Sequence, residues 1–318
     1  MFKTTVAAIA LTLGAATPVL ADFPERPIQI IVPYSAGGST DLGIRVVADA
    51  LESKFDGLRT VVRNQPGGGG GIGTSAAVHA RPDGYTLGAG AQGPIAILPH
   101  VGGADYTVDD FEFVGLFSRS LQLLVACKDA PFNDYDSFMA YAQTKAPQIG
   151  NSGAGGANHV SAEAFAKAAG IKIESIPFGG SSEARTACIG GHIDAMVASP
   201  AEAKTAADAG QMTPLFVMED KRIDLFPDTP TAVEKGVDFT WSSYKGLFAP
   251  KGIPAADLDW LRNAVKEVAS DPAFIAKMTE MGEFVTYEDG PAFEARVKKD
   301  SAMSKAVLED LGLLGMNK

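Results

Sequence analysis

Short apolar runs alternate with helical patterns along the chain, and this alternation is the feature that most constrains the fold. The run Ile28–Val32 is continuous, apolar and bounded by turn residues, which predicts a buried strand. A helical pattern follows over residues 39–53, and a second short strand over residues 60–63. Strands separated by helices are typical of α/β proteins, so we expect mainly parallel sheets flanked by helices.

The length of the chain favours two lobes, because one compact core rarely fills about 300 residues. No low-complexity linker marks a boundary between them in the sequence. The part from Ala255 onward is expected to be mainly helical. Further strands are expected at residues 85–89, 113–117, 121–126, 172–177, 195–198, 214–217 and 246–249, and from Gln148.

The first 21 residues have the pattern of an export signal. Lys3 supplies a positive charge, residues 6–19 form an apolar run, and residues 19–21 (VLA) resemble a cleavage site. The apolar run is short for a membrane span, so an N-terminal anchor helix is the weaker alternative. We expect cleavage after Ala21 and a mature chain located in the periplasm.

The net charge of −11 argues against nucleic acid or an anionic membrane surface as a partner, since both would repel the chain. A small anion can still bind, because local backbone dipoles act within a Debye length of about 8–10 Å.

The two cysteines, Cys127 and Cys188, would enter an oxidising compartment after export. A disulfide between them and two buried free thiols both fit the sequence.

The first predicted strand runs into the segment PYSAGGSTD, residues 33–41. Its two glycines permit a tight turn, and Ser39 or Thr40 can cap the helix that follows. A helix start leaves backbone N–H groups unpaired and carries about half a positive charge. After a parallel strand, such a start can bind an anion at the ligand crevice of an open sheet. The alternative is an ordinary glycine-rich turn with a helix cap.

The segment QIGNSGAGGANH, residues 148–159, repeats this design about 115 residues later, in what would be the other lobe. Two helix starts that face each other across a cleft would suit a ligand held by its carboxylates. His159 opens the second helix, where it can orient the loop, add charge when protonated, or serve as a cap. Asp41 and Arg45 lie on one helix face, so we expect Asp41 to support its loop through an ion pair.

Motifs of common enzymes are absent or incomplete. The glycine run contains G-x-G-x-x-G at residues 68–73, but residues 88–104 offer no acidic side chain for a ribose. No G-x-S-x-G elbow occurs, and the histidines are too scattered to predict a metal site. We therefore expect no enzymatic activity, no cofactor and no metal. A nucleotide-dependent or hydrolytic enzyme is the remote alternative.

Trp241 and Tyr244 are candidates to line the cleft, although core packing is commoner for such residues.

Several ordered segments carry a family resemblance: PYSAGGSTDLGIR, RNQPGGGGGIG, ARPDGYTLG, NSGAGGANH, IPFGGSSEA, GGHIDAM, FPDTPTAVEKG and KGLFAPKGIP. Together they resemble the Bug family, the extracytoplasmic solute receptors of tripartite tricarboxylate transporters, over essentially the whole mature chain. The resemblance implies a two-lobed Venus flytrap joined by two crossover strands. It divides the chain into a signal peptide (1–21), domain I (22–122 and 223–318) and domain II (123–222).

The resemblance also implies a function. A monomer would capture a di- or tricarboxylate or related organic acid and deliver it to the membrane subunits of the transporter. A receptor that feeds a two-component sensor is the alternative partner. Carried over by motif, the ligand-binding residues would be Tyr34, Ser35, Gly38, Ser39, Thr40, Asp41, Gln92, Ser152, Gly153, Ala154, His159, Phe178, Gly179 and Ser199.

The chain departs from the family pattern at three places. Ala36 stands where family members often carry Pro, and Phe178 and Gly179 stand where Tyr and Lys are common. The W-x-G pattern becomes residues 244–246 (YKG). These changes lie away from the two helix starts, so carboxylate binding should survive while the far end of the ligand stays undefined.

Overall fold

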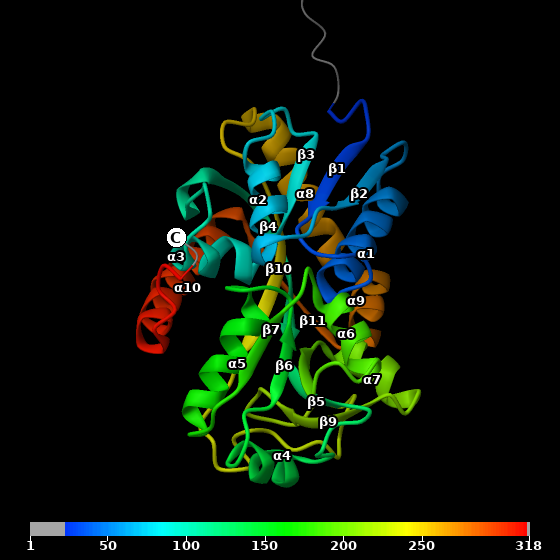
Figure 1. Cartoon of the computed structure of the whole chain (residues 1–318). Helices are drawn as coiled ribbons and strands as arrows, with labels where there is room; N and C mark the ends of the chain where they lie inside the picture. Colours follow the sequence, from blue (N-terminus) through cyan, green and yellow to red (C-terminus); the bar gives the residue numbers. More distant parts are fainter. Residues whose placement is uncertain (1–22, 317–318) are drawn as a thin grey trace, which may run out of the picture.

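A computed structural model describes residues 23–316 as two α/β lobes, one above the other in Figure 1. The predicted export signal and its cleavage site lie outside the described residues. Each lobe has one sheet with helices packed on both of its faces, so the expected two-lobed α/β fold is confirmed. No helix in residues 23–316 is both long and apolar enough to cross a membrane.

The first lobe is built on a six-stranded sheet. The strands follow one another across it in the order β11 (Glu283–Asp289), β4 (Phe111–Leu121), β10 (Ser242–Pro250), β3 (Thr86–Ala91), β1 (Ile28–Val32) and β2 (Thr60–Asn64). One face is covered by α1 (Ser39–Lys54), α8 (Ala255–Ala269) and α9 (Pro272–Glu280), and the other by α2 (Gly71–Val78) and α10 (Gly290–Leu311). Shorter helical turns lie at Gly68–Gly70, Gly93–Ile97, Leu98–Val101 (α3) and Val108–Asp110.

The second lobe is built on a five-stranded sheet. Its strands follow the order β7 (Glu174–Pro177), β6 (Gln148–Asn151), β8 (Ala195–Ala198), β5 (Leu123–Cys127) and β9 (Met212–Val217). One face is covered by α4 (Tyr135–Ala142) and α5 (Ala157–Ala168), and the other by α6 (Ser181–Ile189) and α7 (Pro200–Asp208). A disulfide joins Cys127 at the end of β5 to Cys188 in α6, which decides between the two alternatives left by the sequence.

Both sheets are mixed, so the expectation of mainly parallel sheets is wrong. In the first sheet, β1 runs parallel to β2 and β3, whereas β10 is antiparallel to β3 and β4, and β11 to β4. In the second, β6 is parallel to β7 and β8, whereas β5 is antiparallel to β8 and β9. The physical reason lies in the passages between lobes. Neighbouring strands that carry the chain out of a lobe and back into it must run in opposite directions.

The chain passes between the lobes twice. On the first passage only Gln122 separates β4 of one sheet from β5 of the other. On the second, the segment between β9 and β10 stays with the second lobe, because Ala232 and Phe239 pack in that lobe's core. We therefore propose that the second lobe extends to Trp241, rather than ending at residue 222 as the sequence suggested.

In the C-terminal part, a local sequence pattern accounts for helix α8, whereas pairing with a distant strand accounts for strand β11. Helix α8 buries Leu258, Leu261, Val265 and Val268, a stripe with the three- and four-residue spacing of an amphipathic helix. The mainly helical C-terminal part also contains β11, an edge strand that the sequence pattern did not reveal. Its partner β4 is distant in the sequence, so the strand forms only once the first lobe assembles.

Candidate functional site

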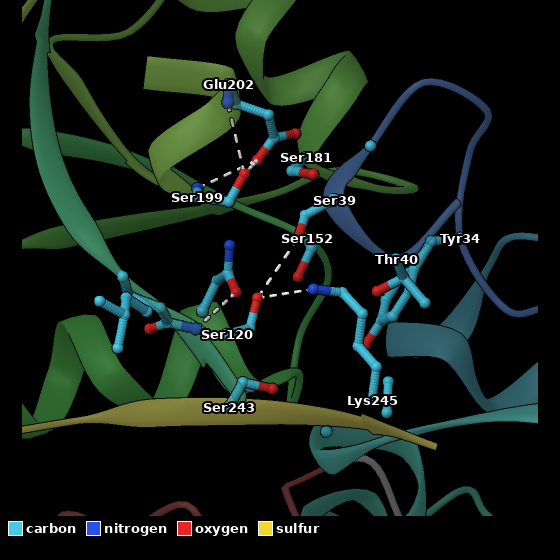
Figure 2. A pocket seen from close by; sticks show the side chains of 17 residues that line it. Tyr34, Ser39, Thr40, Ser120, Ser152, Ser181, Ser199, Glu202, Ser243 and Lys245 are labelled. Atoms are coloured by element: carbon cyan, nitrogen blue, oxygen red, sulfur yellow. Dashed lines mark hydrogen bonds between the residues drawn. The ribbon is translucent and has the colours of Figure 1, made fainter. Parts of the chain in front are cut away.

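A cavity of about 50 Å³ lies between the two lobes and is lined by side chains from both (Figure 2). Serine, threonine and tyrosine hydroxyls dominate the lining, and Lys245 and Glu202 supply its charged groups. The residues that line it are Tyr34, Gly38, Ser39, Thr40, Ala91, Gly93, Ser120, Leu121, Gln122, Ser152, Ala157, Asn158, Ser181, Ser199, Glu202, Ser243 and Lys245.

Four helices begin at this cavity. The first residues of α1, α5 and α6 line it, and no side chain caps any of these three helix starts. Helix α7 begins there as well, capped by the side chain of Ser199. Each helix start concentrates N–H donors and about half a positive charge. The three uncapped starts, those of α1, α5 and α6, therefore form a site that favours negatively charged oxygen atoms, whereas the start of α7 already holds the carboxylate of Glu202. The sequence predicted two of them, α1 and α5.

The lobes touch each other around the cavity. The hydroxyls of Ser35 and Ser182, one from each lobe, lie 2.8 Å apart. A Cβ at Gly69 would lie 2.4 Å from the carbonyl oxygen of Ala154, and one at Gly93 would lie 2.8 Å from the Ala157 nitrogen. A shared apolar cluster, with Leu98 and Val101 from the first lobe and Ala157 and Val160 from the second, joins the lobes on one side. The lobes are therefore packed together over the cavity.

Tyr34 offers a neutral donor at the cavity wall. Its side chain is 7% exposed, and burial raises its pKa. The phenol therefore stays protonated at neutral pH and can donate a hydrogen bond to an anion.

Lys245, another residue of the cavity wall, forms a buried ion pair with Glu283. It is 3% exposed, and its ammonium group donates to Glu283. It also donates, at 2.6 Å, to the hydroxyl of Ser120 (Figure 2). Glu283 also accepts hydrogen bonds from Ser118 and, at 2.8 Å, from Ser120. An ammonium group has three donors, and two of them have protein acceptors here. The third donor of Lys245 can therefore form a hydrogen bond with a ligand, while the carboxylate of Glu283 balances the charge of the lysine.

Asp41 holds the first loop in shape from behind. Its carboxylate accepts hydrogen bonds from the Gly37 N–H at 2.8 Å, Arg45 at 3.0 Å and Asn64 at 2.9 Å. Burial opposes its ionisation, but these hydrogen bonds and the Arg45 charge outweigh burial and lower the pKa of Asp41. The expected ion pair with Arg45 is confirmed, and Asp41 does not line the cavity.

His159 supports the second loop in a similar way. Its Nδ1 accepts the N–H of Gly155 at 3.0 Å, which orients the glycine turn. Burial lowers the pKa of His159, while Glu163, 3.9 Å away, acts weakly in the other direction. The neutral ring is therefore the form that fits this hydrogen bond, which favours the orienting role over an added positive charge.

Six of the ligand-binding residues implied by the sequence line the cavity: Tyr34, Gly38, Ser39, Thr40, Ser152 and Ser199. Asp41 and His159 lie behind the loops, Ser35 is bonded across the lobes, and Gln92 lines a separate hollow. Four further residues line another hollow, where the second loop meets the glycine run of the first lobe: Gly153, Ala154, Phe178 and Gly179. Gly153 and Ala154 miss the cavity because the second loop turns their peptide segment against Gly69.

Trp241 and Tyr244 do not line the cavity either. Tyr244 is buried beside Phe293, and Trp241 stacks on Phe239. Core packing, the commoner fate considered for these two residues, is therefore what the structure shows.

Sequence reasoning missed seven polar residues of the lining: Ser120, Gln122, Asn158, Ser181, Glu202, Ser243 and Lys245. Two of them carried a usable signal. Lys245 directly precedes the apolar run of residues 246–250, and a lysine buried next to such a strand is nearly always paired. Glu202 completes the S-x-x-E pattern of a capping box with Ser199, which marks a helix start. In residues 23–316 no group of His, Cys, Asp and Glu side chains is arranged to hold a metal ion.

Two α/β lobes, linked by two passages and packed over a polar cavity, define the class of two-lobed solute-binding proteins. Residues 44–313 match the family described as "Tripartite tricarboxylate transporter family receptor". The chain belongs to this family, whose members are periplasmic solute-binding receptors. The resemblance seen in the ordered sequence motifs is thereby confirmed.

Related proteins extend over nearly the whole chain. A Cupriavidus necator protein, described as the UPF0065 protein in the gbd 5' region, is 32% identical over 97% of this chain and 95% of its own. The solved structure of Rhodopseudomonas palustris Rpa4515 with adipate has a TM-score of 0.87 at 26% identity, covering 92% of this chain and 99% of that one. MatC from the same organism, with bound malate, has a TM-score of 0.82 at 25% identity, covering 90% and 100%.

Proposed function

We propose that this chain is a periplasmic receptor that captures a small carboxylate between its lobes and delivers it to the membrane subunits of a tripartite tricarboxylate transporter. The family assignment and the relatives with malate and adipate support the proposal. The observation that carries it is the convergence of three uncapped helix starts, those of α1, α5 and α6, on one hydroxyl-lined cavity, because helix starts bind anionic oxygens. The role is binding and release without chemical change of the ligand. A monomer would suffice for it, since residues of both lobes of one chain line the cavity.

The proposed ligand contacts come from both lobes. Backbone N–H groups at the starts of α1, α5 and α6 would receive the carboxylate oxygens, with Tyr34 and Lys245 as side-chain donors. An open arrangement offers a ligand the donors of only one lobe at a time. A ligand that contacts both lobes therefore stabilises the closed arrangement by its differential affinity. The membrane subunits would recognise that closed shape.

Isothermal titration calorimetry tests the binding step. The exported chain is purified, unfolded and refolded to remove retained ligand, and titrated with succinate, malate, aspartate, adipate and citrate. The diamides of succinate, malate and adipate serve as uncharged controls. We expect saturable binding of at least one acid with one site per chain, and no binding of the matching amide. Binding of none of the acids, or equal binding of acid and amide, would contradict the proposal.

Two neighbouring serines of β10 provide a matched pair of variants. Ser243 lines the cavity, whereas Ser242 does not line it and accepts a hydrogen bond from Arg119. Ser243→Asp places a like charge beside the ligand, which costs about 4 kcal/mol at 4 Å for an effective dielectric constant near 20. We expect Ser243→Asp to weaken acid binding at least tenfold and Ser242→Asp to bind like the wild type. Equal affinities of the two variants for the acid would show that the ligand's carboxylate binds away from Ser243.

Uptake measurements test the delivery step. Cells that lack this protein but retain the membrane subunits should not accumulate the radiolabelled acid identified by calorimetry. The wild-type chain should restore uptake, and Ser243→Asp should not. Normal uptake without the protein would refute delivery, even if binding in vitro is confirmed.

A further inference from the structure

Among the residues that line the cavity, two have a buried acceptor oxygen atom for which the protein supplies no hydrogen-bond donor. They are Oε1 of Glu202 and Oε1 of Gln122. The side chains are 2% and 4% exposed, respectively. Buried polar groups in proteins are nearly always hydrogen-bonded, because an unpaired one has lost its water contacts without compensation. These two acceptors therefore indicate what kind of group the ligand presents to them.

Glu202 is held in place by the start of α7. Its Oε2 accepts hydrogen bonds from the Ser199 N–H at 3.1 Å and from the Ser199 hydroxyl at 2.9 Å. This capping box fixes the carboxylate at a helix start, where the helix dipole favours negative charge. The second oxygen, Oε1, has no hydrogen-bond donor in the protein, and Glu202 is one of the residues that line the cavity. Figure 2 shows this carboxylate beside Ser199.

The orientation of the Gln122 amide follows from a chain of hydrogen bonds. Asn158 donates through Nδ2 to the carbonyl of Val197 at 3.1 Å, so its Oδ1 faces the other way. That oxygen accepts from Nε2 of Gln122 at 3.0 Å. The amide of Gln122 therefore presents its oxygen, and not its nitrogen, as the unpaired group.

The charged groups around the cavity also indicate that the ligand carries a hydrogen-bond donor. Lys245 is paired with Glu283, so these two charges offset each other. Within residues 23–316 no ion pair joins Glu202 to a basic side chain, and its hydrogen-bond donors belong to Ser199. A fully ionised, unsubstituted dicarboxylate has no donor for Oε1 of either residue and brings more negative charge to Glu202. A hydroxyl group would satisfy one acceptor, and an ammonium group would also balance the charge.

We propose that the ligand of this receptor is an organic acid that also carries a hydrogen-bond donor, which lies between Glu202 and Gln122 while its carboxylate lies at the starts of α1, α5 and α6. This inference rests on the proposed function and specifies the ligand class within it. The relatives with malate, which has a hydroxyl, and adipate, which has none, indicate that both kinds of acid occur among related proteins. Glu202 and Gln122 indicate that the ligand of this chain, like malate, carries a hydrogen-bond donor.

The test compares three acids with the same four-carbon skeleton: succinate, malate and aspartate, each chiral acid in both enantiomers. We expect the wild-type protein to bind at least one enantiomer of malate or aspartate at least tenfold more tightly than succinate, since sites built around a donor discriminate strongly against its absence. If succinate binds as tightly as the best of the others, the inference is overturned while the proposed function stands. If none of a wider acid panel binds, the proposed function itself fails.

Glu202→Gln isolates the carboxylate, because Gln at this position can keep the capping box. We expect the preference over succinate to fall at least fivefold in this variant, mainly through weaker binding of the donor-bearing acid. Glu234→Gln is the matched control, because Glu234 forms a similar hydrogen-bond pair with Thr231 outside the cavity. It should keep the wild-type preference. An unchanged preference in Glu202→Gln, with the melting temperature preserved, would overturn the role of Glu202.

Discussion

Gly93 lies at a close contact between the two lobes, so Gly93→Ala tests whether the packed arrangement is the ligand-bound form. Its backbone lies outside the left-handed region, and alanine can adopt it. A Cβ there would lie 2.8 Å from the Ala157 nitrogen and 3.2 Å from Cα of Gly156, both in the opposite lobe. It would also lie 3.0 Å from the Tyr34 hydroxyl in its own lobe, where a side chain can shift. The added methyl group therefore penalises chiefly the closed arrangement.

The magnitude follows from overpacking. Adding a methyl group to a tightly packed contact costs about 1–3 kcal/mol. Because a tenfold change in affinity corresponds to about 1.4 kcal/mol, this cost predicts roughly 5- to 150-fold weaker ligand binding. The ligand-free protein should melt near the wild-type temperature, since its lobes can separate and avoid the contact.

Calorimetry with the tightest acid of the panel measures this effect, and thermal unfolding without ligand checks the fold. Gly190→Ala is the control, because Gly190 has a helical backbone and a Cβ there meets only residues of its own lobe, Thr186 and the side chain of His192. It should bind like the wild type. If Gly93→Ala also binds with wild-type affinity, the ligand does not close the lobes in the way described.

Three further predictions concern stability. Lys245→Met leaves the buried Glu283 without its cation and should lower the free energy of unfolding by about 3–5 kcal/mol, whereas adding Glu283→Leu should recover most of the loss in urea unfolding. The double Cys127→Ser and Cys188→Ser variant should lose about 4 kcal/mol, the loop entropy for a separation of 61 residues, and its melting temperature should no longer respond to reductant. The lowered pKa of His159 means that the folded protein binds fewer protons than the unfolded chain, so stability should fall as pH drops below about 6.5 and through the folded pKa. His159→Gln should reduce this slope in unfolding measured between pH 5 and 7.5, and an unchanged slope would exclude His159 as its source.

Much of the fold was predictable because its signals are local. The glycine turns at residues 33–41 and 148–159 were expected to start helices, and α1 and α5 begin there. Strand β1 occupies the predicted range, since a continuous apolar run between turn residues has few other outcomes. The mixed sheets were not predictable in this way, because strand direction depends on how the chain passes between the lobes.

The sequence by itself determined the local units of this protein: the strands, the two glycine turns and the helix starts that follow them, because hydrogen bonds and backbone conformations within a few residues decide such features. The tertiary structure alone decided which units meet. It brought the starts of α6 and α7 to the same cavity and paired Lys245 with Glu283, 38 residues away. It also left Oε1 of Glu202 and of Gln122 without donors. Contacts between distant segments depend on the packing of whole lobes, and no pattern within a few residues specifies them.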